Sequence, residues 1–407
     1  MSTKKIFRLK GVVQHYNWGG SAFIPSLIGL ENASHQPFAE YWLGAHDNAS
    51  STVMLSETES EPLNKLIQAN AGLLLGHQVN DKFHRLPYLL KILDVKDMLS
   101  IQVHPNKKNA EADFARENLS GIPTDSPKRN YKDDNHKPEL MVALSDFWLL
   151  HGFKNKKAVN EALNAVCELQ PLAAIFTKAG YEGLYKYIME MPQEEVNDIL
   201  QPLLQRIITQ YHQQSLEKSS ADFWAARAAL TFNSPGKIDR GIFSIYLFNL
   251  LFLKKGEAIF QAAGVPHAYL EGQNVEIMAN SDNVLRGGLT PKHIDVKELM
   301  KHIVFKAVRP KIIQPAANDH RKIFNTPAAD FELSLFEIRK KESIHHRAGT
   351  TEIVLVVDGE LILKENDTEI LLSRGQSAVL VYGAAVAMKT ATGTAFYLAS
   401  VPIHNRE

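Results

Sequence analysis

The chain has 407 residues, of which 45% are hydrophobic and 22% charged, a composition typical of a soluble enzyme with two or three domains. Its 45 lysine and arginine residues balance its 45 aspartate and glutamate residues, so no overall field favours nucleic acid or an anionic membrane, and neither is an expected partner. The N-terminus lacks the apolar stretch of a secretion signal, and the longest apolar run, 245–253, is too short to cross a membrane. We therefore expect a cytoplasmic protein. The single cysteine, Cys167, excludes a disulfide framework and is predicted to be a buried thiol on a helix.

The first 150 residues consist of short apolar runs separated by glycine, proline, asparagine and aspartate, which predicts mainly β-strands. Strands are expected at 88–93 and 98–103. The spacing of apolar residues at 63–75 instead predicts a helix.

The apolar period changes to that of helices between residues 155 and 232. Helices are expected at 156–169, 196–211 and 221–230. Pro202 lies within the second of them and should kink or divide it, because proline removes one hydrogen bond of the helix.

Strand patterns return at 244–253 and 257–260 and continue to the end of the chain. Alternating apolar residues at 353–357 and 361–363 flank the dipeptide Asp358-Gly359, which predicts a β-hairpin with this dipeptide as its turn.

These patterns together predict a mainly β fold of the sandwich or jelly-roll kind with a helical insertion. A discontinuous first β unit is expected at 1–150 and 233–320, a helical insert at 151–232, and a second β unit at 321–407.

Three polar motifs are candidates for a metal site. Gln102 and His104 are two apart on a predicted strand and share a face. Glu139 begins a predicted strand at 140–144, and His267 lies in a Pro-His turn. Each motif has a structural explanation of its own, as a strand-end histidine, a solvated charged turn or a loop histidine. Together they could supply two imidazole nitrogens and two oxygens to one divalent cation, for which zinc is favoured and cobalt, manganese or iron would also be suitable.

The segment 264–292 is polar in a regular way. Val275, Ile277 and Ala279 alternate with Glu276, Met278 and Asn280, which predicts a strand with one apolar and one chemically equipped face. Arg286 and Lys292 follow on either side of two glycines. They could hold a phosphate dianion, or they could form salt bridges with nearby aspartates, Asp282 or Asp295, and the spacing supports both explanations equally.

With these motifs the chain resembles the type I mannose-6-phosphate isomerases, which are zinc enzymes of the cupin class. The resemblance lies in YNWGG (16–20), AEYWLGAHDNASS (39–51), LLKILDVKDMLSIQVHPNK (89–107), YKDDNHKPEL (131–140) and GVPHAYLEGQNVEIMANSDNVLRGGLTPK (264–292). It implies cupin (jelly-roll) domains and one zinc ion, bound by Gln102, His104, Glu139 and His267. It also implies that Arg286 is catalytic and that the sugar-phosphate pocket is lined by Ser100, Lys91, Lys137, Tyr269, Glu276 and Lys292.

The resemblance further implies the interconversion of mannose 6-phosphate and fructose 6-phosphate through a cis-enediol, in an expected monomer whose partner is the hexose 6-phosphate. Glu276 is the first candidate for the proton-transferring base, with Lys137 or zinc-bound water as rivals. In the second β unit, His345 and His346 should face opposite sides of a strand, and no metal is expected there. The alternatives are another metal-dependent cupin enzyme and a sugar-phosphate-binding protein without catalytic activity.

Overall fold

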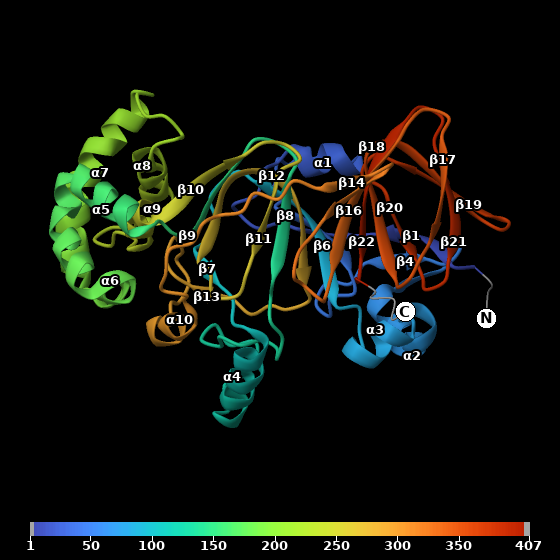
Figure 1. Ribbon diagram of the computed structural model, residues 1–407, viewed down its shortest axis with the longest axis horizontal. Coiled ribbons are helices and arrows are strands. Elements are labelled where there is room, and N and C mark those ends of the chain that lie inside the picture. Colours follow the sequence, from blue (N-terminus) through green and yellow to red (C-terminus); the bar gives the residue numbers. More distant parts are fainter. Residues whose placement is uncertain (1–3, 403–407) are drawn as a thin grey trace.

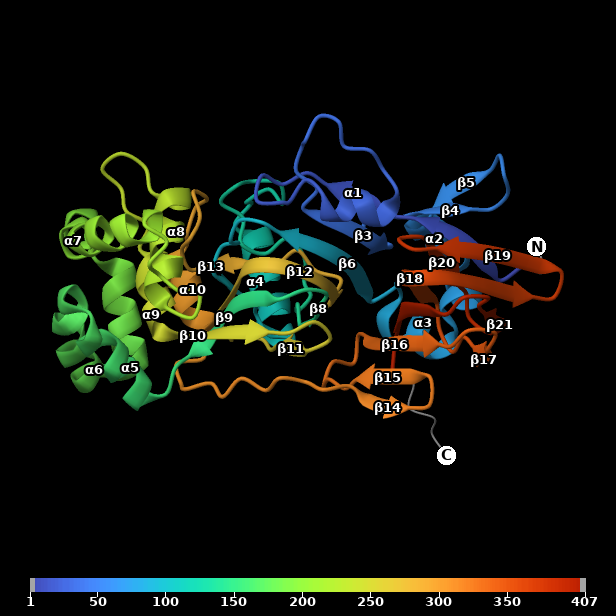
Figure 2. The ribbon, with the colours of Figure 1, turned by 90° about the horizontal axis from the view of Figure 1, so that it is seen from above.

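The computed structural model describes residues 4–402, apart from the side chains of residues 317 and 318. Within these residues the strands form a 10-stranded and a 12-stranded antiparallel sheet, and a block of helices lies beyond the 10-stranded sheet, at the end remote from the 12-stranded one (Figures 1 and 2). The expectation of a mainly β protein with inserted helices is therefore confirmed at this level.

The 10-stranded sheet has the order β10 (Phe248–Leu253), β9 (Phe147–Phe153), β12 (His267–Ala279), β6 (Tyr88–Val95), β3 (Glu40–Gly44) and β2 (Val12–Gln14), with β7 (Gln102–Val103), β8 (Glu139–Ala143), β11 (Ala258–Gln261) and β13 (Leu285–Arg286) paired beside it. The 12-stranded sheet has the order β14 (Ala316–Asn318), β15 (Arg321–Phe324), β16 (Glu332–Ile338), β22 (Thr394–Ser400), β18 (Glu352–Glu365), β20 (Ser377–Leu380), β1 (Ile6–Lys10), β4 (Thr52–Met54) and β5 (Ser60–Pro62), with β17 (Ser343–Arg347), β19 (Thr368–Ser373) and β21 (Ala385–Lys389) beside it.

The helices are α1 (Phe23–Ile28), α2 (Leu63–Leu75), α3 (His77–Phe83), α4 (Lys107–Leu119), α5 (Lys156–Ala165), the 3₁₀ turn η1 (Cys167–Leu169), α6 (Gln170–Glu190), α7 (Gln193–His212), α8 (Ala221–Phe232), α9 (Gly241–Leu247) and α10 (Val296–His302). We refer to α5–α9, residues 156–247, as the helical block.

The start of the chain joins the sheet formed by its end. Strand β1 pairs with β20, with Ile6 opposite Leu380, and β4 and β5 extend the same sheet beyond β1. The 12-stranded sheet therefore crosses the boundary that the sequence predicts at residue 321. Alternating apolar residues do not specify which sheet a strand joins.

Helices α5–α8 of the block form where the apolar period predicts helices. The side chains of Val196, Leu200, Leu203 and Ile207 are buried along one face of α7. This helix continues through Pro202 without being divided, and the interruption lies instead in α6, where Gly180 has a φ of +66°. A positive φ is readily adopted by glycine, which has no Cβ.

Three other local predictions are wrong. The strand expected at 244–253 begins only at Phe248, because residues 241–247 form α9; all of α9 is buried, so its apolar run has no period to separate a helix from a strand. Strand β18 passes straight through the expected hairpin turn, where a register shift and a φ of +70° at Gly359 form a β-bulge. Cys167 is exposed, at the start of the 3₁₀ turn between α5 and α6.

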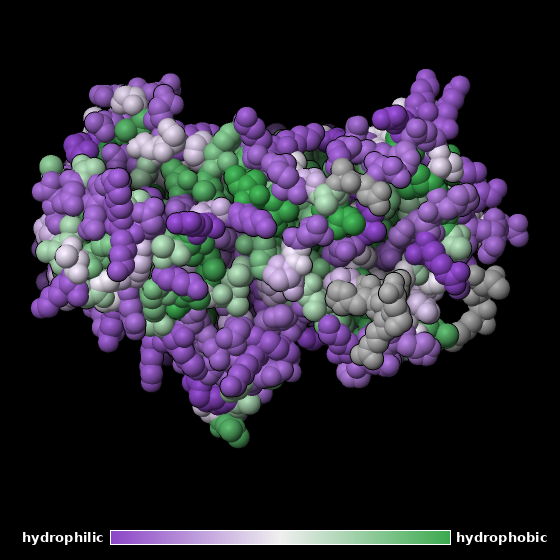
Figure 3. Space-filling view, viewed as in Figure 1, coloured by the Kyte–Doolittle hydropathy of each residue, from purple (hydrophilic) through white to green (hydrophobic). Residues whose placement is uncertain are grey.

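The surface is mainly polar on the face drawn in Figure 3, with apolar patches between the helical block and the central strands. Among residues 4–402 we find no helix with the length and apolar character needed to cross a membrane.

Strand β12 holds the 10-stranded sheet together. Its first part pairs with β9 and with β7, and its second part pairs with β6 on one side and β8 on the other. Between the two parts the register shifts after Tyr269, and Gly272 adopts a φ of +126°. A Cβ at this glycine would lie 2.6 Å from the carbonyl oxygen of Asp146, so the bend requires glycine.

Candidate metal centre

The three motifs that the sequence marks as metal ligands meet around β12. Gln102 on β7 lies opposite His267, and Glu139 on β8 lies opposite Met278. His104 follows β7 directly. Residues from three distant parts of the chain thus come together because one strand pairs with all of their neighbours.

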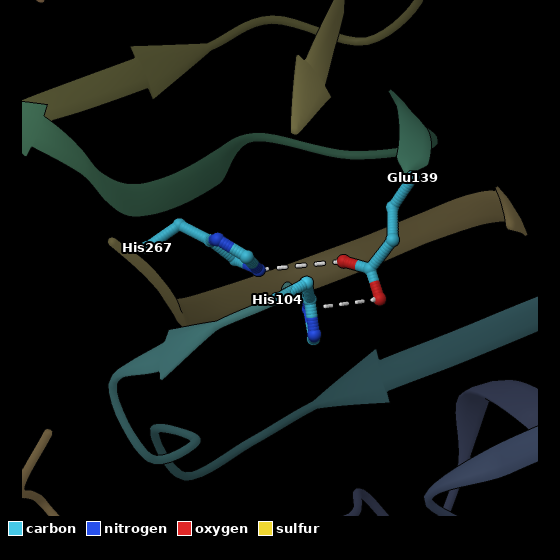
Figure 4. Close-up of side chains that lie close together, drawn as sticks. All are labelled: His104, Glu139 and His267. Atoms are coloured by element: carbon cyan, nitrogen blue, oxygen red, sulfur yellow. Dashed lines mark ion pairs between the residues drawn. The ribbon is translucent and has the colours of Figure 1, made fainter. Parts of the chain in front are cut away.

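His104, Glu139 and His267 form a buried cluster in which one ligand atom from each lies within 4.8 Å of the others. The Nε2 atom of His104 is 3.4 Å from Oε1 of Glu139, and Nε2 of His267 is 3.3 Å from Oε2. Figure 4 shows both rings directed at the same carboxylate.

The hydrogen bonds of the two rings determine which nitrogen is free. Nδ1 of His104 is 2.8 Å from the carbonyl oxygen of Asn283, and Nδ1 of His267 is 3.0 Å from that of Val265. A carbonyl oxygen only accepts, so each Nδ1 carries a proton, and Nε2 is the nitrogen of each ring that can offer a lone pair to a metal ion.

Two lone pairs that face a carboxylate need a cation between them. Burial lowers the pKa of His104 despite the nearby charge of Glu139, which favours the neutral ring. Burial opposes the charge of Glu139, yet His104 and Lys137 outweigh it and hold the pKa of Glu139 well below its usual range. Nε2 of His104 is also buried without a hydrogen-bond partner. Two imidazoles and a carboxylate in this state fit a divalent cation such as zinc.

A polar cavity of about 50 Å³ opens beside this cluster. Its walls contain seven of the site residues that the sequence identifies, together with two leucines and Glu40. They are Glu40, Lys91, Leu93, Leu99, Gln102, Lys137, Glu139, His267, Tyr269 and Glu276.

Glu276 is a second carboxyl group of this cavity, and its pKa is shifted in the opposite direction from that of Glu139. It is buried, it accepts a hydrogen bond of 2.8 Å from the Tyr269 hydroxyl, and its Oε1 is 3.6 Å from Nζ of Lys91. Burial and the negative charge of Glu139 raise the pKa of Glu276 to about 7, although Lys91 opposes the shift. Such a carboxyl group can both take and release a proton near neutral pH.

Lys91 is fixed as a cation between two acids. Burial disfavours its charge, but Glu40, Glu276 and Glu139 outweigh burial and raise the pKa of Lys91. Its Nζ is 3.3 Å from Oε2 of Glu40. Lys137 lies nearer the candidate metal, with its Nζ 3.5 Å from Oε1 of Glu139.

Glu40 is the charged residue in the cavity lining to which the sequence assigns no chemical role. It lies on β3, where it also accepts a hydrogen bond from the indole of Trp42, two residues along the same strand. The sequence does place Glu40 and Trp42 two residues apart on one strand, so that they share a face. Strand β3 pairs with β6, which carries Lys91. This pairing joins two distant segments of the chain, and it brings Glu40 beside Lys91.

Arg286, Lys292 and Ser100 lie outside the lining of this cavity. Arg286 is half-buried on β13, opposite Gln102, and Lys292 is exposed six residues later. Ser100 is half-buried between Leu99 and Ile101 on the segment that leads into β7.

Among residues 4–402, Arg286 and Lys292 have no carboxylate within salt-bridge distance. The two aspartates considered as partners are used elsewhere: Asp282 pairs with His46 at 3.2 Å, and Asp295 caps helix α10. Burial lowers the pKa of Arg286, and burial together with the charge of Arg286 lowers that of Lys292. Two neighbouring cations without an acid are suited to binding an anion.

The chain is similar to known proteins over most of its length. A family model described as phosphomannose isomerase type I, catalytic domain, matches residues 6–156. Mannose-6-phosphate isomerase of Escherichia coli (strain K12) is 37% identical over 379 residues, which cover 92% of this chain and 94% of that protein. The Homo sapiens protein of the same name is 30% identical over 415 residues, with 94% and 95% covered. The crystal structure of mannose 6-phosphate isomerase from Salmonella typhimurium bound to its substrate, fructose 6-phosphate, and to zinc superposes with a TM-score of 0.87 at 33% identity, and covers 98% of this chain and 100% of that one.

The raised pKa of Glu276 predicts a pH-dependent effect on stability. From the ordinary value of 4.5 up to about 7 the folded protein keeps a proton that the unfolded chain has lost, so stability falls as pH rises through this window. In metal-free protein, Glu276→Gln should therefore be more stable than the parent at about pH 8, by roughly 3–4 kcal/mol, since each pKa unit corresponds to about 1.4 kcal/mol. The difference should disappear as pH falls to 4.5.

Thermal unfolding followed by circular dichroism in a chelating buffer measures this difference. Lys91 keeps Glu40 as a partner in the variant, and Glu57→Gln, at an exposed position, serves as the control. Equal unfolding temperatures of parent and Glu276→Gln at about pH 8 would show that Glu276 is ionised in the fold without penalty.

Proposed function

Because the chain belongs to the type I phosphomannose isomerases and interconverts mannose 6-phosphate and fructose 6-phosphate, we propose that the cavity beside Glu139 is where this reaction occurs. The observation that carries the proposal is the meeting of two imidazoles on one buried carboxylate, next to a second carboxyl group with a pKa of about 7. An aldose–ketose isomerase needs both features, a site for positive charge and a group that moves a proton.

The cofactor is zinc, and we assign His104, Glu139 and His267 as its ligands with Gln102 as the fourth. Gln102 is supported by its position opposite His267 and in the cavity wall beside Glu139. An amide oxygen is a weak donor, so Gln102 is the ligand with the smallest expected contribution. When bound, zinc supplies positive charge that stabilises negative charge developing on the sugar oxygens.

Glu276 is the proposed base. It takes the proton from C2 of the open-chain aldose, which leaves a cis-enediolate with the negative charge on O1; the hydroxyl proton of O2 passes to O1, and Glu276 returns its proton to C1 to give the ketose, so no net proton is gained or lost. The Tyr269 hydroxyl donates to its Oε2 and fixes its orientation. Lys91 stays protonated and so serves as a cation beside this base. Lys137, the rival base, contacts Glu139 instead of Glu276.

Arg286 and Lys292 are proposed to bind the charged parts of the substrate. Arg286 lies opposite the proposed ligand Gln102, and its role in this proposal is to polarise the O1/O2 edge of the sugar as charge develops there. Lys292, with Ser100, would hold the phosphate. The absence of a carboxylate partner for either cation among residues 4–402 supports this assignment, because the positive charge is left for the ligand.

We also propose that the two sheets belong to cupin (jelly-roll) units, with the catalytic unit mainly at 1–150 and 233–320 and a metal-free unit mainly at 321–407, whose sheet β1, β4 and β5 join. The helical insert predicted at 151–232 corresponds to the helical block, which extends to residue 247. His345 and His346 alternate along β17, and His346 pairs with Glu352 at 2.5 Å. A cytoplasmic location and a monomeric state stay predictions, of which light scattering tests the second.

Removing a ligand should remove metal and activity together. His104→Ala and His267→Ala should each lose most of their zinc after dialysis and most of their isomerase activity, since a missing imidazole commonly costs a metal site much of its affinity. Elemental analysis measures the metal. His136→Ala is the matched control, because this histidine lies on the same loop as Glu139 but pairs with Asp330. Full zinc occupancy in both ligand variants would disprove the assignment.

Arg286→Ala should keep its zinc and lose kcat. Loss of one preorganised charge that stabilises a transition state typically lowers kcat about 10²–10³-fold. Steady-state kinetics with fructose 6-phosphate measure this, with the exposed Arg309→Ala as the control. A normal kcat with a raised KM would move Arg286 from catalysis to phosphate binding.

The enediol predicts exchange with solvent. During turnover in deuterium oxide, deuterium should enter C2 of mannose 6-phosphate and C1 of fructose 6-phosphate, and Glu276→Gln should abolish both turnover and exchange. Mass spectrometry of the recovered sugars measures the label. Turnover without any incorporation would indicate a direct hydride shift.

A further inference from the structure

The turn that carries Arg286 and Lys292 is held by one carboxylate from the helical block. Oδ1 of Asp239 accepts hydrogen bonds from the backbone N–H groups of Leu289 at 2.8 Å and Gly241 at 2.7 Å, and Oδ2 accepts one from Thr290 at 3.0 Å. Asp239 is buried, and among residues 4–402 it forms no salt bridge. Its charge is therefore used to hold the backbone.

The turn has a conformation that it would not adopt unaided. Gly288 has a φ of +119°, and Leu289 has a φ of +55°, which is uncommon for a residue with a branched side chain. A left-handed residue of this kind costs of the order of 1 kcal/mol and persists only when its surroundings impose it. Two of the three bonds from Asp239 are made at Leu289 and at the residue after it.

The helical block also fits the turn sterically. A Cβ on Gly288 would lie 2.4 Å from Cα of Gly241, and a Cβ on Gly241 would lie 2.5 Å from the backbone nitrogen of Leu289. The hydroxyl of Tyr185, on α6, would be 2.9 Å from a Cβ on Gly287. The backbones of turn and block are thus in contact where neither has a side chain.

The opposite side of the turn is bonded to the strand of the metal site. Gly287 N–H donates to the carbonyl oxygen of Ile101 at 2.9 Å, and Ile101 N–H donates to that of Gly288 at 3.0 Å. Arg286 lies next to these bonds, opposite Gln102. Lys292 is linked to one of the residues that Asp239 holds, because its N–H donates to Oγ1 of Thr290 at 3.1 Å.

We propose that Asp239 is a positioning residue that sets Arg286, and secondarily Lys292, relative to the metal site, and that this is a function of the helical block in the reaction. This inference rests on the proposed role of Arg286. A shift of about 1 Å in a catalytic group can cost a factor of 10² in rate. Losing the hydrogen bonds to Asp239 should therefore slow the reaction measurably, although Asp239 does not line the cavity.

The test is Asp239→Asn. The side chain keeps its size, but one acceptor oxygen becomes an amide that presents N–H toward the N–H of Thr290. We expect kcat to fall about 10- to 100-fold with zinc content unchanged, and KM to change less than kcat. Asp222→Asn is the matched control, because this carboxylate belongs to the same block but accepts from the Tyr246 hydroxyl, which is also part of the block and not of the turn. Equal kinetics of the two variants would overturn the proposal.

A double-mutant cycle separates positioning from general destabilisation. If Asp239 acts through Arg286, Asp239→Asn should have little further effect on kcat in an Arg286→Ala background, whereas fully multiplicative losses would refute the proposal. Normal activity of Arg286→Ala alone would instead reject the proposed role of Arg286. Should Asp239→Asn fail to fold, Gly241→Ala replaces it in the cycle, because its methyl group would displace the same turn at Leu289.

Discussion

The burial of Glu139 is the constraint on which the rest of the site depends. An isolated carboxylate costs several kcal/mol to remove from water, so it must be paired, hydrogen-bonded or bound to a metal. Among residues 4–402 its two oxygens face two imidazole nitrogens, and Lys137 is the one lysine or arginine whose side-chain nitrogen lies within 4 Å of it. A divalent cation completes the balance. Together with burial, the same negative charge raises the pKa of Glu276, so the carboxylate proposed as a metal ligand also prepares the proposed base to exchange a proton near neutral pH.

The geometry of β12 makes this arrangement possible. Along a regular strand, side chains alternate between faces, so His267 and Glu276, nine residues apart, would point to opposite sides. The register shift after Tyr269 changes the alternation, and His267, Tyr269 and Glu276 line one cavity. The strand pattern at 275–280 predicts the second half of this strand correctly. The bulge is not visible in it, because it depends on how β9 pairs with β12.

What the sequence could predict and what it could not differ by the range of the interaction involved. The residues proposed as metal ligands lie in short motifs with distinctive residues, and helices α5–α8 have a regular apolar period, so the sequence alone can suggest both. The roles of Glu40 and Asp239 cannot be predicted from their own segments. Each is an ordinary acid in its own segment and gains its role from a contact with a residue 51 or 50 positions away, Lys91 or Leu289. The pairing of β1 with β20 is of the same kind, as is the buried helix α9, whose apolar run matches a strand equally well.

The position of the helical block in the chain explains how it can reach the site. The block is inserted between β9 and β10, which pair with each other as antiparallel neighbours. Its two ends must therefore lie close together, and the cost of closing a loop grows only slowly with its length, so a long insertion is tolerated there. Asp239 lies just before α9, the helix that leads the chain back into β10, and this return brings it beside the turn at 287–290. A shorter connection could join the same two strands, but it would leave the strained turn beside Arg286 without the Asp239 carboxylate and the Gly241 contact that now hold it.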